Sequence, residues 1–239
     1  MVHQVYQDRD GYIWISTFYG LFRYDGYEVR TYKSNLYTPG LLVNNNVICV
    51  EEDYSHRLWI GTHEGLCVLD KQTGKMRKMK LEGISKHRLN EIHVTKDNKV
   101  YLGYIRGMAC YNAELDTLEL MTSKNCKGEV PEQINIQTLL EDENGDLLIG
   151  TWQDGLFHYN IKENKFIHYP PLDESNSVLA LFQDSKGALW IGTSGSGLYK
   201  VNFSPDKKIL SVEKAYKHDA LNTLSLIHIS EPTRRTPIS

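Results

Sequence analysis

The chain has 239 residues, of which 41% are apolar and 24% are charged, which is the composition of an ordinary globular protein rather than a disordered one. Its formal net charge is −3 at pH 7, with lysines and arginines scattered along the chain, so we expect no nucleic acid among its partners. No apolar run approaches the roughly 18 residues that span a bilayer, and the first residues lack the pattern of a signal peptide.

One motif recurs five times along the chain. Its most regular copy, residues 184–198, reads DSKGALWIGTSGSGL: a turn, an apolar strand, a second turn and the start of another strand. The other copies are residues 8–21, 53–66, 97–108 and 142–156. The centres of the five copies lie 45, 42, 47 and 42 residues apart, at Trp14, Trp59, Tyr101, Leu148 and Trp190. A period in the low to middle forties with short strands predicts a β-propeller.

Each repeat is predicted to form one blade of four strands, A to D. In the second repeat these are residues 47–52, 58–62, 66–70 and 75–81. An Asp-x-x-Gly turn joins A to B, with His56 in place of glycine in the second repeat and a shortened turn around Asp97 and Asn98 in the third. The sequence therefore predicts an all-β fold of five four-stranded blades.

Strand B carries the residues that we expect to be scaffold. The tryptophans at its centre are predicted to be core, because each blade lies between two neighbours. The glycine that follows should let the adjacent blade approach closely, since a side chain there would prevent it. Serine replaces it at position 16, and the glycines are Gly61, Gly103, Gly150 and Gly192.

The end of the chain departs from the repeat. Residues 216–225 match the opening of a sixth blade, but residues 224–234 (LSLIHISEPTR) resemble translated sequencing-adaptor DNA. We therefore assign residues 1–223 to five blades and the start of a sixth, and residues 224–239 to a non-native tail. The chain is expected to be a gene fragment truncated at both ends.

With its five copies of D-x-x-G-x-[LI]-W-I-G-T-x-x-G-L, the chain resembles the two-component regulator propeller repeat over residues 2–223. The third copy departs most, with Tyr101, Tyr104 and Met108 in place of Trp, Thr and Leu. Residues 11–27 resemble the first blade of the extracytoplasmic sensor region in hybrid two-component proteins of gut Bacteroidetes.

This resemblance implies a larger protein with two seven-bladed propellers, a β-sandwich, a membrane span, a histidine kinase core, a receiver and a DNA-binding module. The chain would then be part of one seven-bladed propeller in the periplasm. Its partners would be the second propeller and the kinase domains of the parent chain, with a homodimer as a further option. Members of the family commonly sense glycan fragments, so the implied ligand is an oligosaccharide or another small polar molecule.

Candidate binding residues lie between strands B and C. In an antiparallel blade the B–C and D–A connections share one rim, and variable loops on a rigid scaffold are where recognition is expected. Aromatic rings pack on sugar faces, and charged groups bind hydroxyls. Trp152 is the foremost candidate because it lies outside the core tryptophan position, although packing over the rim would also explain it. The full set is Phe18, Tyr19, His63, Glu64, Arg106, Trp152 and Asp154.

The chain shows no local catalytic motif. Neither a nucleophile with its base nor a pair of carboxylates at defined spacing is visible, so we expect a binding domain without cofactor or metal. The four cysteines are interpreted as small apolar residues in strands. Two alternatives stay open: a propeller enzyme, either a lyase or a glycan hydrolase with residues from different blades, and a protein-interaction scaffold.

Overall fold

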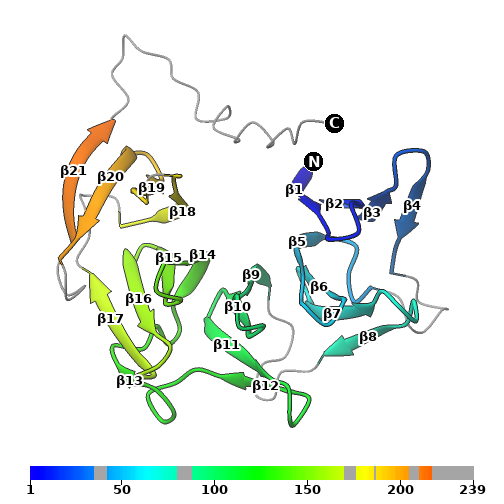
Figure 1. Ribbon diagram of the computed structural model, residues 1–239, viewed down its shortest axis with the longest axis horizontal. Coiled ribbons are helices and arrows are strands. Elements are labelled where there is room, and N and C mark those ends of the chain that lie inside the picture. The colour runs from blue at the N-terminus through cyan, green and yellow to red at the C-terminus, as the bar shows by residue number, and fades with distance from the viewer. Residues whose placement is uncertain (35–41, 80–87, 170–175, 186, 205–209, 217–239) are drawn as a thin grey trace.

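The computed structural model describes residues 1–34, 42–79, 88–169, 176–185, 187–204 and 210–216. These residues form five β-sheets arranged along an arc, with the first and last sheets at its two ends (Figure 1). The described part of the chain contains no helix, so the all-β prediction is confirmed. The proposed sixth blade and the tail begin at or beyond Tyr216, and residues 217–239 lie outside the described residues.

Each sheet is an antiparallel meander, which we call a blade and number in chain order. Blade four gains a short fifth strand, β13 (Lys127–Gly128), which pairs in parallel with β17. The strands A to D are β1 (Val2–Gln7), β2 (Ile13–Thr17), β3 (Gly20–Tyr24) and β4 (Val29–Tyr32) in blade one; β5 (Val47–Glu52), β6 (Arg57–Thr62), β7 (Gly65–Asp70) and β8 (Met76–Met79) in blade two; β9 (Leu89–Val94), β10 (Val100–Tyr104), β11 (Gly107–Asn112) and β12 (Thr117–Leu120) in blade three; β14 (Asn135–Glu141), β15 (Leu147–Trp152), β16 (Leu156–Asn160) and β17 (Lys165–Tyr169) in blade four; β18 (Val178–Gln183), β19 (Leu189–Thr193), β20 (Gly197–Phe203) and β21 (Leu210–Tyr216) in blade five.

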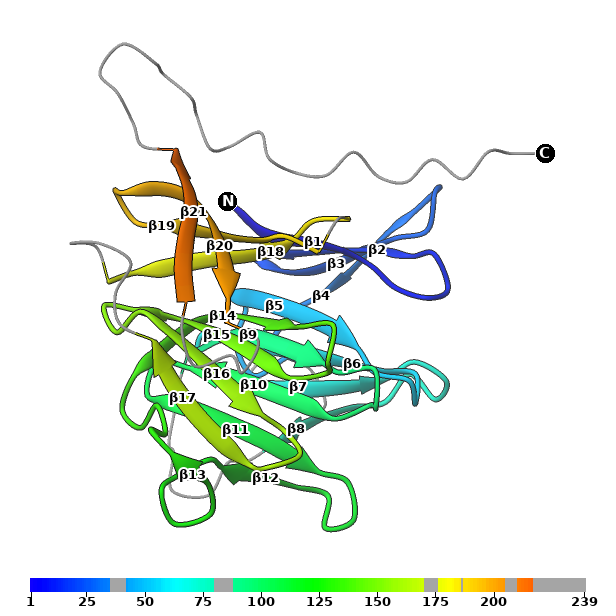
Figure 2. The ribbon, with the colours of Figure 1, turned by 60° about the vertical axis from the view of Figure 1, so that its left-hand side comes forward.

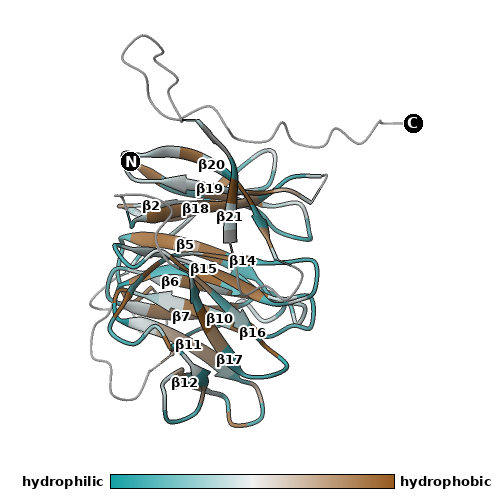
Figure 3. Cartoon of the chain, turned by 90° about the vertical axis from the view of Figure 1, so that its left-hand side faces the viewer, coloured by the Kyte–Doolittle hydropathy of each residue, from teal (hydrophilic) through white to brown (hydrophobic). Residues whose placement is uncertain are grey.

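The innermost strands of the five blades are β1, β5, β9, β14 and β18 (Figure 1), and each contacts the next along the arc. Figure 2 shows the same blades from the side. The strands are largely apolar, whereas the connections at both ends of the blades are hydrophilic (Figure 3). The hydrophobic core is accordingly divided into layers between successive blades, because blades two, three and four each bury both faces against their neighbours.

The repeated aspartate holds the repeated tryptophan. In blade two, one oxygen of Asp53 accepts from the backbone N–H groups of Ser55 and Arg57, and the other accepts from Trp59 Nε1 at 2.8 Å. The same indole bond joins Asp8 to Trp14 and Asp184 to Trp190. Trp14 and Trp59 are buried, so their predicted core role is confirmed.

The A–B turn of blade three corrects the sequence alignment. Thr95, and not Asp97, holds the position of the repeated aspartate. The Thr95 N–H donates to the Lys99 carbonyl and its own carbonyl accepts from Asn98, the same pair of bonds that closes the turn after Asp8. The turn is therefore not shortened. Asn98 takes the glycine position with φ of 61°, a conformation that asparagine tolerates better than most residues.

Successive blades meet through two different faces. We call the face toward the next blade along the chain the forward face, and the face toward the previous blade the rear face. Trp14 and Leu21 on the forward face of blade one share a core cluster with Val50 and Ile60 on the rear face of blade two. Trp59 in blade two and Ile92 in blade three repeat this arrangement. The chain therefore uses one type of interface repeatedly.

The strand B glycines permit this close packing. A Cβ atom at Gly61 would lie 2.5 Å from Leu89 of blade three, and one at Gly103 would lie 2.6 Å from Ile136 of blade four. The predicted close approach is confirmed there, since real Cβ atoms do not come so near to other side chains. Gly192 in blade five differs, because its nearest neighbour is Ala180 of its own blade, at 3.4 Å.

Candidate functional site

The connections between strands B and C lie beside the starts of the inner strands. The N–H of His63 donates to the Asn46 carbonyl at 2.9 Å, and the N–H of Ser194 donates to the Ser177 carbonyl at 3.1 Å. We call this end of the propeller the loop rim. These hydrogen bonds place the B–C and D–A connections at the same rim, as the sequence predicted.

The repeated threonine fixes each B–C turn from within. Its hydroxyl donates across the turn to the carbonyl of the glycine that opens strand C or immediately precedes it, at 2.7–3.0 Å in four blades. This leaves the side chains between the threonine and the glycine free to vary without altering the turn. The four threonines are Thr17, Thr62, Thr151 and Thr193.

The seven predicted site residues all lie at the B–C connections of blades one to four, spread along the rim rather than gathered in one pocket. Six of them are exposed and Asp154 is half-buried. Trp152 is the last residue of β15, pairs in register with Asn135, and keeps 41% of its surface exposed. Phe18 packs against the ring of His3 with centroids 4.5 Å apart. The Asp154 carbonyl lies 2.7 Å from His168 Nε2.

Every inner strand has a β-bulge at its start, next to these turns. The register shifts place one extra residue there in each blade, and bulges characteristically re-aim a side chain. These bulge residues are His3, Ile48, Asn90, Gln137 and Leu179. Three of the five, His3, Asn90 and Gln137, are polar.

The polar bulge residues form hydrogen bonds within and between blades. His3 Nε2 lies 3.1 Å from Asn46 Oδ1, which links blade one to blade two. Asn90 Nδ2 donates to Asn135 Oδ1 at 2.8 Å and to the Ile136 carbonyl, which links blade three to blade four. Gln137 Nε2 donates to the same Asn135 oxygen at 2.8 Å. This amide cluster was not predicted, because it joins residues of two different repeats.

Two carboxyl groups lie on the inner strands of blades two and three. Burial raises the pKa of Glu51 on β5 to about 8, against a hydrogen bond from the Val94 N–H that lowers it. Burial likewise raises the pKa of Glu91 on β9 to about 7. At neutral pH these carboxyls can donate as well as accept hydrogen bonds, and Glu91 lies one residue from the amide cluster.

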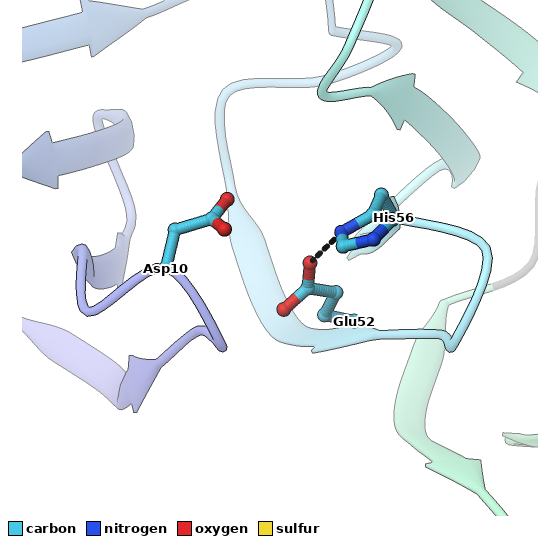
Figure 4. A group of neighbouring side chains, drawn as sticks. All are labelled: Asp10, Glu52 and His56. Carbon is cyan, nitrogen blue, oxygen red and sulfur yellow. Dashed lines mark ion pairs between the residues drawn. The ribbon is translucent and has the colours of Figure 1, made fainter.

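One group with the spacing of cation ligands lies at the opposite end of the blades. Asp10 reaches from blade one toward Glu52 and His56 of blade two (Figure 4), and His56 Nδ1 lies 3.7 Å from Glu52 Oε1. Lys71 Nζ lies 2.6 Å from Asp10 and 2.7 Å from both Asp8 and Glu52. Burial acts to lower the pKa of Lys71, but hydrogen bonds to the three carboxylates raise it above its usual value. The lysine ammonium thus supplies the positive charge between these blades.

A second group of this kind is buried in blade four, where Leu148 occupies the tryptophan position. His158, the cross-strand neighbour of Leu148, has its Nε2 3.3 Å from Asp146 Oδ2 and 3.9 Å from Asp142 Oδ2. The three side chains have the spacing to hold a cation. Here an imidazole lies against the repeated aspartate, which in blades one, two and five accepts from an indole.

The blades, their threonine-closed turns and their layered cores define the chain as a β-propeller. Residues 1–19, 41–64 and 173–195 match the family model of the two component regulator propeller. These three segments therefore match the two-component regulator propeller repeat. No curated protein matches it.

Solved structures share the fold at low sequence identity. The extracellular domain assigned to a hybrid two-component system of B. thetaiotaomicron is 22% identical with a TM-score of 0.72, covering 88% of this chain and 29% of that one. A similar domain, assigned to a one-component system of the same organism, is 24% identical with a TM-score of 0.67, covering 90% and 28%. Virginiamycin B lyase from Staphylococcus aureus is 10% identical with a TM-score of 0.69, covering 89% and 69%. The chain thus spans less than a third of the two extracellular domains.

No helix among the described residues is long and apolar enough to cross a membrane.

Proposed function

We propose that this chain is a ligand-sensing part of an extracytoplasmic receptor region and that its loop rim binds an oligosaccharide or another small polar ligand. The observation that carries the proposal is the amide cluster of Asn90, Asn135 and Gln137, in which Asn135 is the cross-strand partner of the exposed Trp152. Amide donors and acceptors match sugar hydroxyls, and an aromatic ring matches the apolar face of a sugar. The propeller repeats and the fold shared with extracellular domains of signalling systems support the assignment to a receptor.

In the complete protein, the site would act on a histidine kinase through a second propeller. Binding would favour one arrangement of the receptor over another, which requires a difference in ligand affinity between the two arrangements. The receptor region would lie in the periplasm, with the kinase on the other side of the membrane.

A glycan array followed by calorimetry on a positive oligosaccharide tests the binding proposal. Replacing Trp152 or Asn135 by alanine should weaken binding at least tenfold, which corresponds to about 1.4 kcal/mol. Tyr27→Ala is the matched control, because Tyr27 is an exposed aromatic residue in a C–D turn at the other end of blade one. Unchanged affinity in both rim variants, with the fold intact by circular dichroism, would remove this part of the rim from the site.

A propeller lyase or glycan hydrolase is the second candidate. It is favoured by Glu91, because a carboxyl with a pKa of about 7 suits proton transfer at neutral pH. Mass spectrometry of the oligosaccharides after incubation separates the two functions. Cleavage that disappears in Glu91→Gln would establish the enzyme, whereas binding without turnover supports the sensor. A protein-interaction scaffold would show neither.

A further inference from the structure

Blade four departs from the repeat at three positions that the fold brings together. Leu148 replaces the tryptophan of strand B. Asp146, just before β15, holds the position of Arg57 in blade two, since both donate their N–H to the repeated aspartate of their own blade. His158 on β16 pairs in register with Leu148, at the position that Val68 has in blade two. Two of the three changes introduce ionisable groups with lone pairs that can bind a metal ion.

In blades one and two, the repeated aspartate is paired with a positive charge. Asp53 Oδ2 accepts from Trp59 Nε1 at 2.8 Å and from Arg57 Nε at 2.7 Å. Asp8 Oδ2 likewise lies 2.7 Å from Lys71 Nζ. These contacts follow the general rule that buried charges are paired or coordinate metals.

In blade four the repeated aspartate lies beside a second carboxylate and an imidazole. His158 Nε2 is 3.3 Å from Asp146 Oδ2 and 3.9 Å from Asp142 Oδ2. One atom from each side chain lies within 4.8 Å of the other two, and all three residues are buried. Two carboxylates can carry two negative charges, which is the charge that a divalent cation balances.

Hydrogen bonds from the backbone and from one side chain hold both carboxylates in place. Asp142 Oδ1 accepts from the N–H groups of Asn144 at 2.8 Å and Asp146 at 3.1 Å. Asp146 Oδ1 accepts from the Ile161 N–H at 3.3 Å, and its Oδ2 accepts from Asn160 Nδ2 at 3.2 Å. Hydrogen bonds of this kind orient the ligands of a metal site.

The donor atoms of this group favour zinc. Imidazole binds zinc well, whereas calcium and magnesium prefer sites made of oxygen alone. Ligand atoms about 2.0 Å from a tetrahedral zinc ion lie about 3.3 Å apart, which is the distance between His158 Nε2 and Asp146 Oδ2. A small rotation of Asp142 would shorten its 3.9 Å separation. The side chains of Asp142 and Asp146 keep 11% and 9% of their surface exposed, so water can reach the group as a fourth ligand.

We propose that Asp142, Asp146 and His158 form a zinc-binding site in blade four. The ion would link the A–B turn to β16, beside the core layer that Leu148 shares with blade five. No metal was expected from the sequence, because these ligands come together only when β15 pairs with β16. The site lies at the end of the blade opposite the loop rim, so it is independent of the ligand-binding function proposed above.

Calorimetric titration of the whole chain with Zn²⁺, after EDTA treatment and dialysis, tests the proposal. The wild type should bind one ion at this site and melt at a higher temperature with zinc, because an ion that binds only the folded state stabilises it. Asp146→Ala and His158→Val introduce the residues that blades five and two have at these positions, Ala188 and Val68. Each should weaken zinc binding by about 100-fold or more, since even residues that only support metal ligands contribute 10–100-fold.

His56→Gln is the matched control. It removes the imidazole of the other group with cation-ligand spacing (Figure 4), where the Lys71 ammonium already lies within 2.7 Å of Asp10 and Glu52. This variant should bind zinc like the wild type. Co²⁺ in place of Zn²⁺ should give the intense visible bands of a tetrahedral ion without a thiolate charge-transfer band, which checks that the cysteines are not the ligands.

Four results would overturn the proposal: a wild type that binds no zinc, unchanged affinity in both blade-four variants, loss of binding in His56→Gln, or a thiolate band with Co²⁺. Circular dichroism would verify that the variants fold. If a blade-four variant does not fold, the stoichiometry of the wild type, its cobalt spectrum and the His56→Gln titration still decide the outcome. Loss of zinc binding leaves the glycan experiment unaffected, so the two proposals can fail separately.

Discussion

Lys71 joins blade one to blade two, and its replacement by methionine is expected to destabilise the protein strongly. Its ammonium lies within 2.7 Å of three carboxylates, while the side chain keeps only 8% of its surface exposed. Methionine preserves the length and apolar stem of the side chain but removes the charge. Two of the partners, Asp8 and Glu52, are fully buried, so they would lose a buried cation that balances them.

The expected loss in the free energy of unfolding is about 3 kcal/mol, at the lower end of the range for breaking a buried ion pair. The lower end applies because both carboxylates keep other donors. Asp8 still accepts from Trp14 Nε1, and Glu52 still accepts from the N–H of Arg9. For a chain of this size, that loss lowers the melting temperature by about 6–12 °C. Lys71→Arg, which keeps the charge, should lose less.

Urea unfolding at low protein concentration, followed by tryptophan fluorescence, measures the effect. Lys200→Met is the matched control, since Lys200 pairs with Glu213 at 2.8 Å near the surface of blade five. Exposed pairs of this kind contribute about 0–1 kcal/mol. If Lys71→Met costs no more than Lys200→Met, the buried ammonium does not hold the two blades together and the reasoning fails.

Three further predictions test the packing between blades. Burial raises the pKa of Glu91 to about 7 in the folded state, so its ionisation destabilises the fold as the pH rises from the pKa of the unfolded state toward 7. Glu91→Gln should therefore leave the free energy of unfolding unchanged at pH 4 and raise it at pH 8 by at most about 3 kcal/mol, as measured by urea unfolding. Trp59→Phe removes the indole donor to a buried aspartate and should cost about 1–3 kcal/mol, more than Trp190→Phe in the half-covered blade five. Gly103→Ala adds a methyl group against blade four and should cost about 1–3 kcal/mol in thermal unfolding, whereas Gly192→Ala should be nearly neutral.

The repeat itself made the blades predictable. The repeat period predicted four strands per blade. The position of the tryptophans and glycines in strand B predicted that they pack between blades. Trp59 and Gly61 hold the predicted places, since the indole is buried and the glycine touches the next blade. Blade three was misaligned because Asp97 resembles the repeated aspartate but does not occupy its position. The turn is defined by its backbone hydrogen bonds, and Thr95 makes those bonds without a carboxylate.

The amide cluster could not be predicted in the same way. Asn90 and Asn135 are 45 residues apart, which is the distance between repeats rather than the spacing of a local motif. Their contact depends on how two blades pack and on a bulge in each inner strand, and neither leaves a mark in one repeat alone. Trp152 was selected as a candidate from the sequence because it lies outside the core tryptophan position of the repeat, whereas its cross-strand partner Asn135 was not.

The bulges shift the expected centre of the site toward blades three and four. The same backbone irregularity is present in all five blades, so its existence belongs to the scaffold. The bulge residue itself differs between blades. It is apolar in blades two and five, which have Ile48 and Leu179, and it is an amide in blades three and four, which have Asn90 and Gln137. Local departures from a pattern that the fold otherwise keeps are expected at functional sites. Trp152 pairs with Asn135, the residue to which both of these amides donate. The exposed ring and the amide cluster are therefore better tested as one site than as separate surface residues.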